Sequence, residues 1–156
     1  MRNDPDVVTV TVDLELELDL ELELERMSIR EDETMEWKIE LVTIPVTDVD
    51  RAKAFYVEQA GFVADHDHAV NDELRFVQLT PPGSACSIAI GTGLTESPPG
   101  SAQVLMVVAD IHAARDELRS RGLEVGEVET LPWGSFVFFA DPDGNRWSVQ
   151  QPDLRG

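Results

Sequence analysis

The sequence predicts an α+β fold made of two similar modules, each with one strand, one helix and three further strands (βαβββ). The chain has 156 residues, 42% of them hydrophobic, which suits one globular core. The same order of strand and helix signals occurs twice, and residues 46–48 match residues 108–110 at an offset of 62. Each helix is amphipathic and must cover one face of its own sheet, so we expect the two pseudo-symmetric modules to form a curved sheet around a shared cavity.

In the first module, residues 39–46 are rich in β-branched side chains and predict a strand. Asp48 is the expected cap of a helix over residues 49–59 that ends near Gly61. Three strands are then expected at residues 62–70, 73–79 and 86–91, separated by turn residues 71–72 and 81–83.

The second module repeats this order. A strand is expected at residues 104–108, followed by a helix that is capped by Asp110 and ends at Gly122. The three remaining strands are expected at residues 124–129, 135–140 and 146–151. Helical spacing predicts the buried positions of both helices, namely Val49, Ala52, Phe55, Tyr56, Ile111, Ala114 and Leu118.

Residues 1–36 form a separate, acidic, low-complexity segment ahead of the domain, which spans residues 37–156 with modules at about 37–95 and 102–152. Val or Leu alternates with Thr, Asp or Glu over residues 8–25, which is typical of a strand, but the like charges would disfavour pairing. We therefore expect a solvated tail. An added edge strand or partner-binding segment is one alternative, and translation that begins at Met27 or Met35 is another.

Charge and cysteine content narrow the classes of function. The formal net charge is -19, so nucleic acids and anionic membranes are not expected partners. Cys86 is the only cysteine and cannot form an intramolecular disulfide. Because neither a secretory signal nor a long apolar run is present, we expect a soluble, cytoplasmic protein.

Two motifs stand in this order along the chain. The first is IPVTDVDRAKAFY at residues 44–56, followed by Gly61, and the second is DPDGN at residues 141–145. With the paired modules, these motifs resemble the vicinal oxygen chelate superfamily, which includes glyoxalase I, bleomycin-resistance proteins and extradiol dioxygenases. The resemblance covers residues 36–151 and implies the glyoxalase-like fold. Members of this superfamily often pair two chains, and bare sheet edges make a homodimer plausible.

In metal-dependent members, the resemblance implies ligands on the first and last strand of each module. These positions fall at Leu41, Ala89, Gln103 and Ser148. Leucine and alanine have no donor atom, and the other two side chains are neutral, weak ligands. We therefore predict no metal and no other cofactor. A divalent metal stays open as an alternative, because a one-residue slip would bring Glu40 into the site, although it would also move the apolar row of that strand off the helix-covered face.

Aromatic and amide side chains are the remaining candidates for a ligand-binding site. The last hairpin contains Trp133, Phe136, Phe138, Phe139 and Trp147, and strand alternation sends some of these rings into the core and others into the cavity. The expected ligand-binding residues are Gln103, Trp133, Phe138, Trp147, Ser148 and Gln150. Rings can stack on a flat organic ligand, while amide and hydroxyl groups orient it.

The remaining polar residues are weaker candidates. His66 and His68 lie two apart on a predicted strand and should share a face, opposite Asp65 and Asp67, but no third metal ligand is nearby in sequence. We interpret them as a solvated edge, and their role stays undecided. Cys86 has no histidine beside it in sequence and is interpreted as core filler. Residues 141–144 are interpreted as the turn of a hairpin, without a catalytic role.

Two classes of function remain. The first is a metal-free protein of the bleomycin-resistance kind that binds a small organic molecule, aromatic or cationic, with the acidic body attracting cations. The alternative is a metal-dependent lyase or isomerase of the glyoxalase I type, or a dioxygenase-like enzyme, in which a metal polarises a carbonyl. Whether the chain is an enzyme stays open, and a glyoxalase-like lyase is the expected activity if it is one. The donor-poor ligand positions favour the binding protein.

Overall fold

The computed structural model describes residues 34–153 and divides the chain into two compact units, Met1–Lys38 and Ile39–Gly156. Every helix and strand of the described residues belongs to the second unit. The predicted acidic tail lies almost wholly outside the described residues. Within residues 34–153, no helix has both the length and the apolar character needed to span a membrane.

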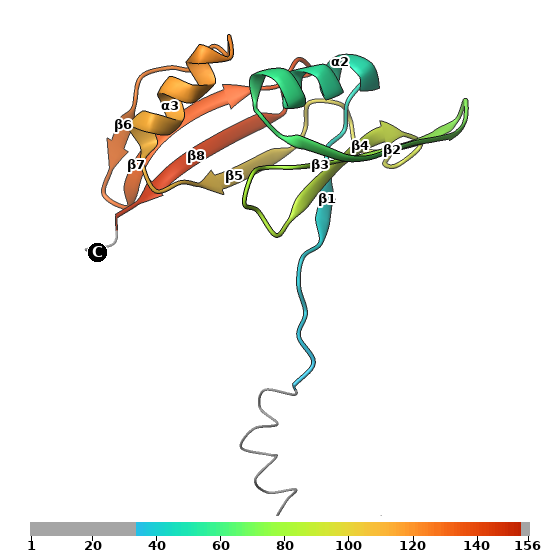
Figure 1. The fold of residues 1–156 in the computed structure, drawn as a ribbon, viewed down its shortest axis with the longest axis horizontal. Coiled ribbons are helices and arrows are strands. Elements are labelled where there is room, and N and C mark those ends of the chain that lie inside the picture. Colours follow the sequence, from blue (N-terminus) through green and yellow to red (C-terminus); the bar gives the residue numbers. More distant parts are fainter. Residues whose placement is uncertain (1–33, 154–156) are drawn as a thin grey trace, which may run out of the picture. The chain divides into compact units, whose positions relative to one another are not determined.

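Module one has the predicted βαβββ order (Figure 1). Its elements are β1 (Leu41–Thr43), helix α2 (Val49–Ala54) with the π-helical turn η1 (Phe55–Gln59), β2 (Val63–Asn71), β3 (Leu74–Thr80) and β4 (Ser87–Thr92). These strands form sheet A in the order β1-β4-β3-β2, with β1 parallel to β4. Asp48 caps α2 as predicted, because its carboxylate accepts a hydrogen bond from the Arg51 backbone N–H at 3.1 Å.

Module two repeats the order with β5 (Gln103–Val107), α3 (Ile111–Ser120), β6 (Glu129–Leu131), β7 (Gly134–Ala140) and β8 (Arg146–Pro152). They form sheet B in the order β5-β8-β7-β6, again with a parallel first pair. Asp110 caps α3, as predicted.

The predicted strand over residues 124–129 is wrong, because β6 begins only at Glu129. The preceding residues run instead along α3, where the Gly126 carbonyl accepts a hydrogen bond from Arg115 Nε at 2.7 Å. The alternating apolar residues Leu123 and Val125 pack against the core from this position. Their spacing of two therefore reflects contact with the core, not pairing in a sheet.

One hydrophobic core joins both modules. It lies between the helices and one face of each sheet, and both helices lie on the same side of the two sheets (Figure 1). The core strands contribute Val77, Leu79, Ile88, Ile90, Val137, Phe139, Trp147 and Val149, and all predicted helix positions are buried except Ala114, which is half-buried. Among residues 34–153, no helix lies on the opposite face of either sheet, and this face is called the helix-free face below.

The DPDGN motif links the two modules from inside this core. Asn145 is completely buried and donates from Nδ2 to the Pro45 carbonyl and to Asp141 Oδ2, both at 2.8 Å. The hydroxyl of Tyr56 also donates to Asp141 Oδ2 at 2.7 Å and accepts from Trp147 Nε1 at 2.9 Å. Burial raises the pKa of Tyr56 above its ordinary range, and the Asp141 carboxylate adds to this shift, so the phenol stays a donor. We name these five residues the intermodule clamp.

A second contact between the motifs lies at the surface. The Asp143 carboxylate accepts hydrogen bonds from the Thr47 hydroxyl at 2.7 Å and from the Thr47 backbone N–H at 3.2 Å. Arg51 Nη2 approaches the same carboxylate at 3.6 Å. Residues 141–144 therefore do more than turn the chain, because they fix module two against the first strand–helix connection of module one.

An ion cluster attaches helix α2 to the outer strands of sheet A. Asp67 accepts from Lys53 Nζ at 2.7 Å and from Arg75 Nη2 at 2.8 Å, and Arg75 also contacts Asp50 at 2.9 Å. The hydrogen bonds from Arg75, and next those from Lys53, hold the pKa of the Asp67 carboxyl well below its usual range. Asp67 therefore favours the folded state whenever it is ionised.

This pKa shift predicts a pH-dependent loss of stability. Because the folded pKa of Asp67 lies below the unfolded value of about 3.9, its contribution is complete above that pH and is lost as the pH falls through the folded pKa. The Asp67→Asn variant should be less stable than wild type at pH 7, and the gap should narrow below about pH 4. Urea unfolding at both pH values measures this, with Asp116→Asn as control. A gap that is constant with pH would contradict the assignment.

Candidate functional site

The helix-free face of sheet B presents alternate residues of its strands. Strand register places Gln103 beside Arg146, and Leu105 and Phe138 on either side of Ser148. The residues between them, such as Trp147, face the core. Gln103, Phe138, Arg146 and Ser148 all line one groove of about 510 Å³, which we name the module-two groove.

The groove has an aromatic part and a polar part. Phe138 is 42% exposed, and its ring stacks on Phe136 with centroids 5.9 Å apart and planes within 4°. The side chains of Gln103, Arg146 and Ser148 make no hydrogen bond to any other described residue. An exposed ring beside uncommitted donors is the arrangement that holds and orients an organic ligand.

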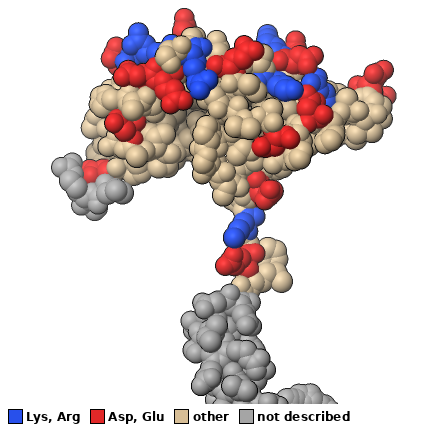
Figure 2. Space-filling view, in the orientation of Figure 1, with Lys and Arg blue, Asp and Glu red and all other residues tan. Residues whose placement is uncertain are grey.

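The charge distribution sets this face apart. Figure 2 shows charged side chains gathered over the helices, whereas the surface beneath them is mostly uncharged. Strands β5, β7 and β8 contain no Asp or Glu, and Arg146 is their only charged residue. The acidity of the chain is therefore not a property of the groove.

The structure separates the predicted ligand-binding residues into two groups. Gln103, Phe138 and Ser148 come together in the groove. Trp147 also borders the groove, but it is 1% exposed and its side chain donates a hydrogen bond to Tyr56 in the core, so little of it is open to a ligand.

Trp133 and Gln150 lie beyond the groove at the other end of sheet B. Trp133 is 61% exposed in the turn before β7, and its carbonyl accepts a hydrogen bond from Gln150 Nε2 at 3.0 Å. Sequence reasoning missed Arg146, which lines the groove. The sequence could have indicated Arg146, because it precedes Ser148 by two residues on the same strand. Residues two apart on a strand share a face.

The four positions where the resemblance to the vicinal oxygen chelate superfamily implies metal ligands share the helix-free faces. Leu41 pairs with Ser87 in a register that puts Leu41 and Ala89 on this face of sheet A, and Gln103 and Ser148 lie on that of sheet B. Glu40 lies one residue away, out of phase with Leu41. Hydrocarbon side chains at two of the four positions do not fit a divalent cation. Among residues 34–153, no three His, Cys, Asp or Glu side chains gather to form a possible metal site.

His66 and His68 lie on the helix-free face of sheet A, opposite Gln78 and Phe76 on β3. Both are exposed, with stacked rings whose centroids are 5.8 Å apart. The prediction that Asp65 shares the opposite face with Asp67 is wrong for Asp65. The register shift between Ala64 and His66 breaks the alternation, which leaves Asp65 hydrogen-bonded to the hydroxyl of Thr80.

A chain of polar side chains crosses this face of sheet A. Thr80 Oγ1, which donates to Asp65, lies 2.7 Å from Ser87 Oγ, and Gln78 Nε2 donates to Ser87 Oγ at 3.1 Å. Ser87 is only 5% exposed. These groups satisfy one another and are less free to bind a ligand than those of the module-two groove. Cys86, the residue before β4, is half-buried.

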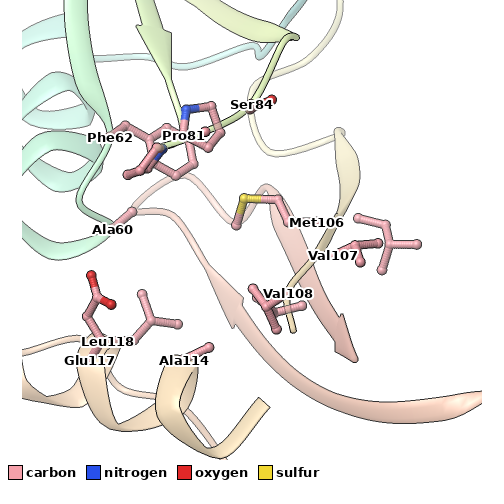
Figure 3. Close-up of a pocket in the computed structure, with 14 residues that line it drawn as sticks. Ala60, Phe62, Pro81, Ser84, Met106, Val107, Val108, Ala114, Glu117 and Leu118 are labelled. Carbon is pink, nitrogen blue, oxygen red and sulfur yellow. The ribbon is translucent and has the colours of Figure 1, made fainter. Parts of the chain in front are cut away.

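A second pocket of about 460 Å³ lies between the modules, beside α3, β5 and the β3–β4 turn (Figure 3). Apolar side chains such as Phe62, Met106 and Leu118 line most of it. Its one carboxylate, Glu117, is already 3.6 Å from Arg121. The hydroxyl of Ser84 donates to the Cys86 carbonyl at 2.7 Å. The pocket can accept an apolar group but has few free polar groups to orient it.

Two βαβββ modules with helices on one side of their sheets define the glyoxalase-like class of α+β proteins. The model of the glyoxalase/bleomycin resistance protein/dioxygenase superfamily matches residues 38–149. The chain belongs to this superfamily, as its two motifs indicated.

Individual relatives agree with this membership. The uncharacterized protein YetH of Bacillus subtilis (strain 168) is 30% identical over 117 residues, which cover 73% of this chain and 98% of YetH. The crystal structure of TnmS3, an antibiotic binding protein from Streptomyces sp. CB03234, has a TM-score of 0.69 and 33% identity, with 77% of this chain and 99% of TnmS3 covered. A superfamily member from Sphaerobacter thermophilus DSM 20745 has a TM-score of 0.65 and 30% identity, with 76% and 99% covered.

Proposed function

We propose that this protein binds a flat organic molecule in the module-two groove and does so without a metal ion. The observation that carries the proposal is the groove itself, which joins the exposed Phe138 ring to the free polar groups of Gln103, Arg146 and Ser148. The similarity to TnmS3, an antibiotic binding protein, supports small-molecule binding as the role of such a fold.

The groove suits capture of a ligand by stacking. A planar ligand laid on Phe138 buries apolar surface on a ring that Phe136 already holds in place. The amide of Gln103 and the hydroxyl of Ser148, from neighbouring strands, then hydrogen-bond its polar edge. Because these strands are fixed by the sheet, little ordering is required on binding.

A metal-dependent lyase is the competing function, and the donor set argues against it. The superfamily resemblance places metal ligands at four positions. Two of these are occupied by Leu41 and Ala89, whose side chains have no atom that can bind a metal. Elemental analysis of the purified protein distinguishes the two functions. Stoichiometric nickel, zinc or iron, lost together with a lyase activity on chelation, would contradict the proposal.

The proposal predicts a strong effect of Phe138. Replacing it with Ala should weaken binding of an anthracene probe about tenfold, because the stacking surface is lost. Fluorescence anisotropy of the bound anthracene measures the affinity. Trp133→Ala is the matched control, since Trp133 is also exposed but lies outside the groove, and it should bind like wild type. If no anthracene probe binds wild type, whether the probe is anionic, neutral or cationic, the proposed function is wrong.

We further propose that a second copy of the chain covers the helix-free face of sheet B. Leu105 and Val107 are 53% and 62% exposed on β5, an edge strand next to the groove. Together with Phe138 they form an apolar surface without acidic residues, on which two acidic chains can meet with little repulsion. A copy placed there would enclose the groove and remove its ligand from water.

The dimer proposal predicts that Val107→Lys yields a monomer, because each interface would then bury an unpaired charge. Light scattering after size-exclusion chromatography measures the mass in solution. Val70→Lys is the matched control, since Val70 is 66% exposed on β2 in the other module. A wild-type chain that stays monomeric at high concentration would contradict the proposal and leave the groove open to solvent.

A further inference from the structure

We propose that the ligand of the module-two groove is an aromatic acid, a flat ring system with a carboxylate or a comparable oxyanion, and that Arg146 binds the anionic group. This inference rests on the proposed function, because it specifies the chemistry of the ligand in the same groove. The net charge of -19 suggests a cationic ligand, whereas the ligand inferred here is an anion.

Arg146 differs from most cations of the described residues in having no carboxylate within 4.0 Å. Residues 34–153 contain eight Lys and Arg residues, and six of them lie within 4.0 Å of an Asp or Glu. The two without such a partner among the described residues are Arg119 and Arg146. Arg146 is exposed and lines the groove, so no carboxylate of the described residues neutralises its guanidinium there.

The strands around Arg146 place no carboxylate beside it. Arg146 pairs with Gln103 on β5 and with Ala140 on β7, both uncharged. The nearest acid on this face of the sheet is Glu129 of β6, which pairs with Phe136, four residues along β7 from Ala140, or about 13 Å. Arg75, the only other Arg in a strand of residues 34–153, turns to the helix side and contacts Asp50 and Asp67. Arg146 is thus the one Lys or Arg on the described helix-free faces.

The groups beside Arg146 select a carboxylate over other ligand groups. A guanidinium donates two parallel N–H groups to the two oxygens of a carboxylate, and the Nε2 amide of Gln103 offers a further donor next to it. A neutral amide or ketone can accept the same hydrogen bonds but lacks the charge. An amine would be repelled. Phe138, two strand positions from Ala140 on the adjacent β7, would hold the ring system of the same molecule.

The experiment measures how three matched probes bind the full-length protein. Anthracene-2-carboxylate, anthracene-2-carboxamide and 2-(aminomethyl)anthracene share one ring system and differ in charge. Anisotropy titrations are run at 0.15 M salt, where the screening length of about 8 Å limits the effect of distant acidic residues. The variants are Arg146→Gln, Arg146→Lys and, as matched control, Arg119→Gln, which removes the other unpaired arginine outside the groove.

Wild type should bind the carboxylate at least about tenfold more tightly than the carboxamide, and the amine most weakly. Arg146→Gln should abolish this preference while the carboxamide affinity stays within about twofold, and Arg146→Lys should restore part of it. Arg119→Gln should behave like wild type.

Two results would overturn the inference while leaving the proposed function intact. In the first, wild type binds the carboxylate and the carboxamide equally. In the second, Arg146→Gln lowers the mass in solution without changing the preference among probes, which would show that Arg146 pairs with a carboxylate of a second copy. Failure of all three probes to bind wild type would instead refute the proposed function.

Discussion

Replacing Asn145 with Ala should destabilise the folded protein by about 4 kcal/mol. Its side chain is completely buried and makes three hydrogen bonds, to Pro45 O, Asp141 Oδ2 and the Ala102 backbone N–H. Truncation leaves each of these groups buried without one of its partners. The loss is a large part of the whole stability of a native protein, which is only about 5–15 kcal/mol.

Urea unfolding followed by tryptophan fluorescence measures this loss. Asn71→Ala is the matched control, since Asn71 is exposed and bonds only the nearby Glu73 N–H. Should Asn145→Ala fail to accumulate, Thr47→Val tests the surface part of the same junction, by removing the hydroxyl that donates to Asp143. A loss below about 1 kcal/mol for Asn145→Ala would show that the modules do not depend on the clamp.

Replacing Trp147 with Ala should cost a similar amount, about 4 kcal/mol, through the cavity it leaves. Trp147 is 1% exposed and packs against Phe139, with centroids 5.9 Å apart, and against Tyr56 and Phe62. Chemical unfolding measures the loss. The result separates two roles of an aromatic residue on β8, since a ligand contact would affect binding and leave stability nearly unchanged.

The conservative variant Trp147→Phe isolates the ligand question. It removes the Nε1 donor to Tyr56 but keeps an aromatic ring in the core. We expect it to bind anthracene-2-carboxylate like wild type. Weakened binding by Trp147→Phe together with unchanged binding by Phe138→Ala would place the ligand on the helix side of sheet B. That result would contradict binding in the module-two groove.

The fold could be predicted largely from local signals. Asp48 and Asp110 have the side-chain oxygen that a helix N-terminus requires, and both cap as expected. Apolar spacing identified the buried helix positions, because a helix on a sheet buries one stripe. The strand at residues 124–129 failed since packing along α3 produces the same alternation as pairing in a sheet.

The candidate site was harder to predict because it depends on which way a side chain faces. Trp147 and Ser148 are neighbours, yet one is in the core and the other in the groove, and only the register with β5 and β7 decides between them. Arg146 was missed for a different reason. Arg146 is a candidate because no carboxylate lies near it. Whether a carboxylate lies near depends on where the fold places all the acidic side chains around Arg146.

We expect the ligand to lie in the module-two groove and not in the pocket between the modules. An NMR titration of isotope-labelled protein with anthracene-2-carboxylate distinguishes the two places. We predict saturable shifts of the backbone amides of Gln103, Phe138, Arg146 and Ser148, with little change at Phe62 and Leu118. Shifts concentrated at Phe62, Met106 and Leu118 would contradict the account, because those residues line the pocket between the modules.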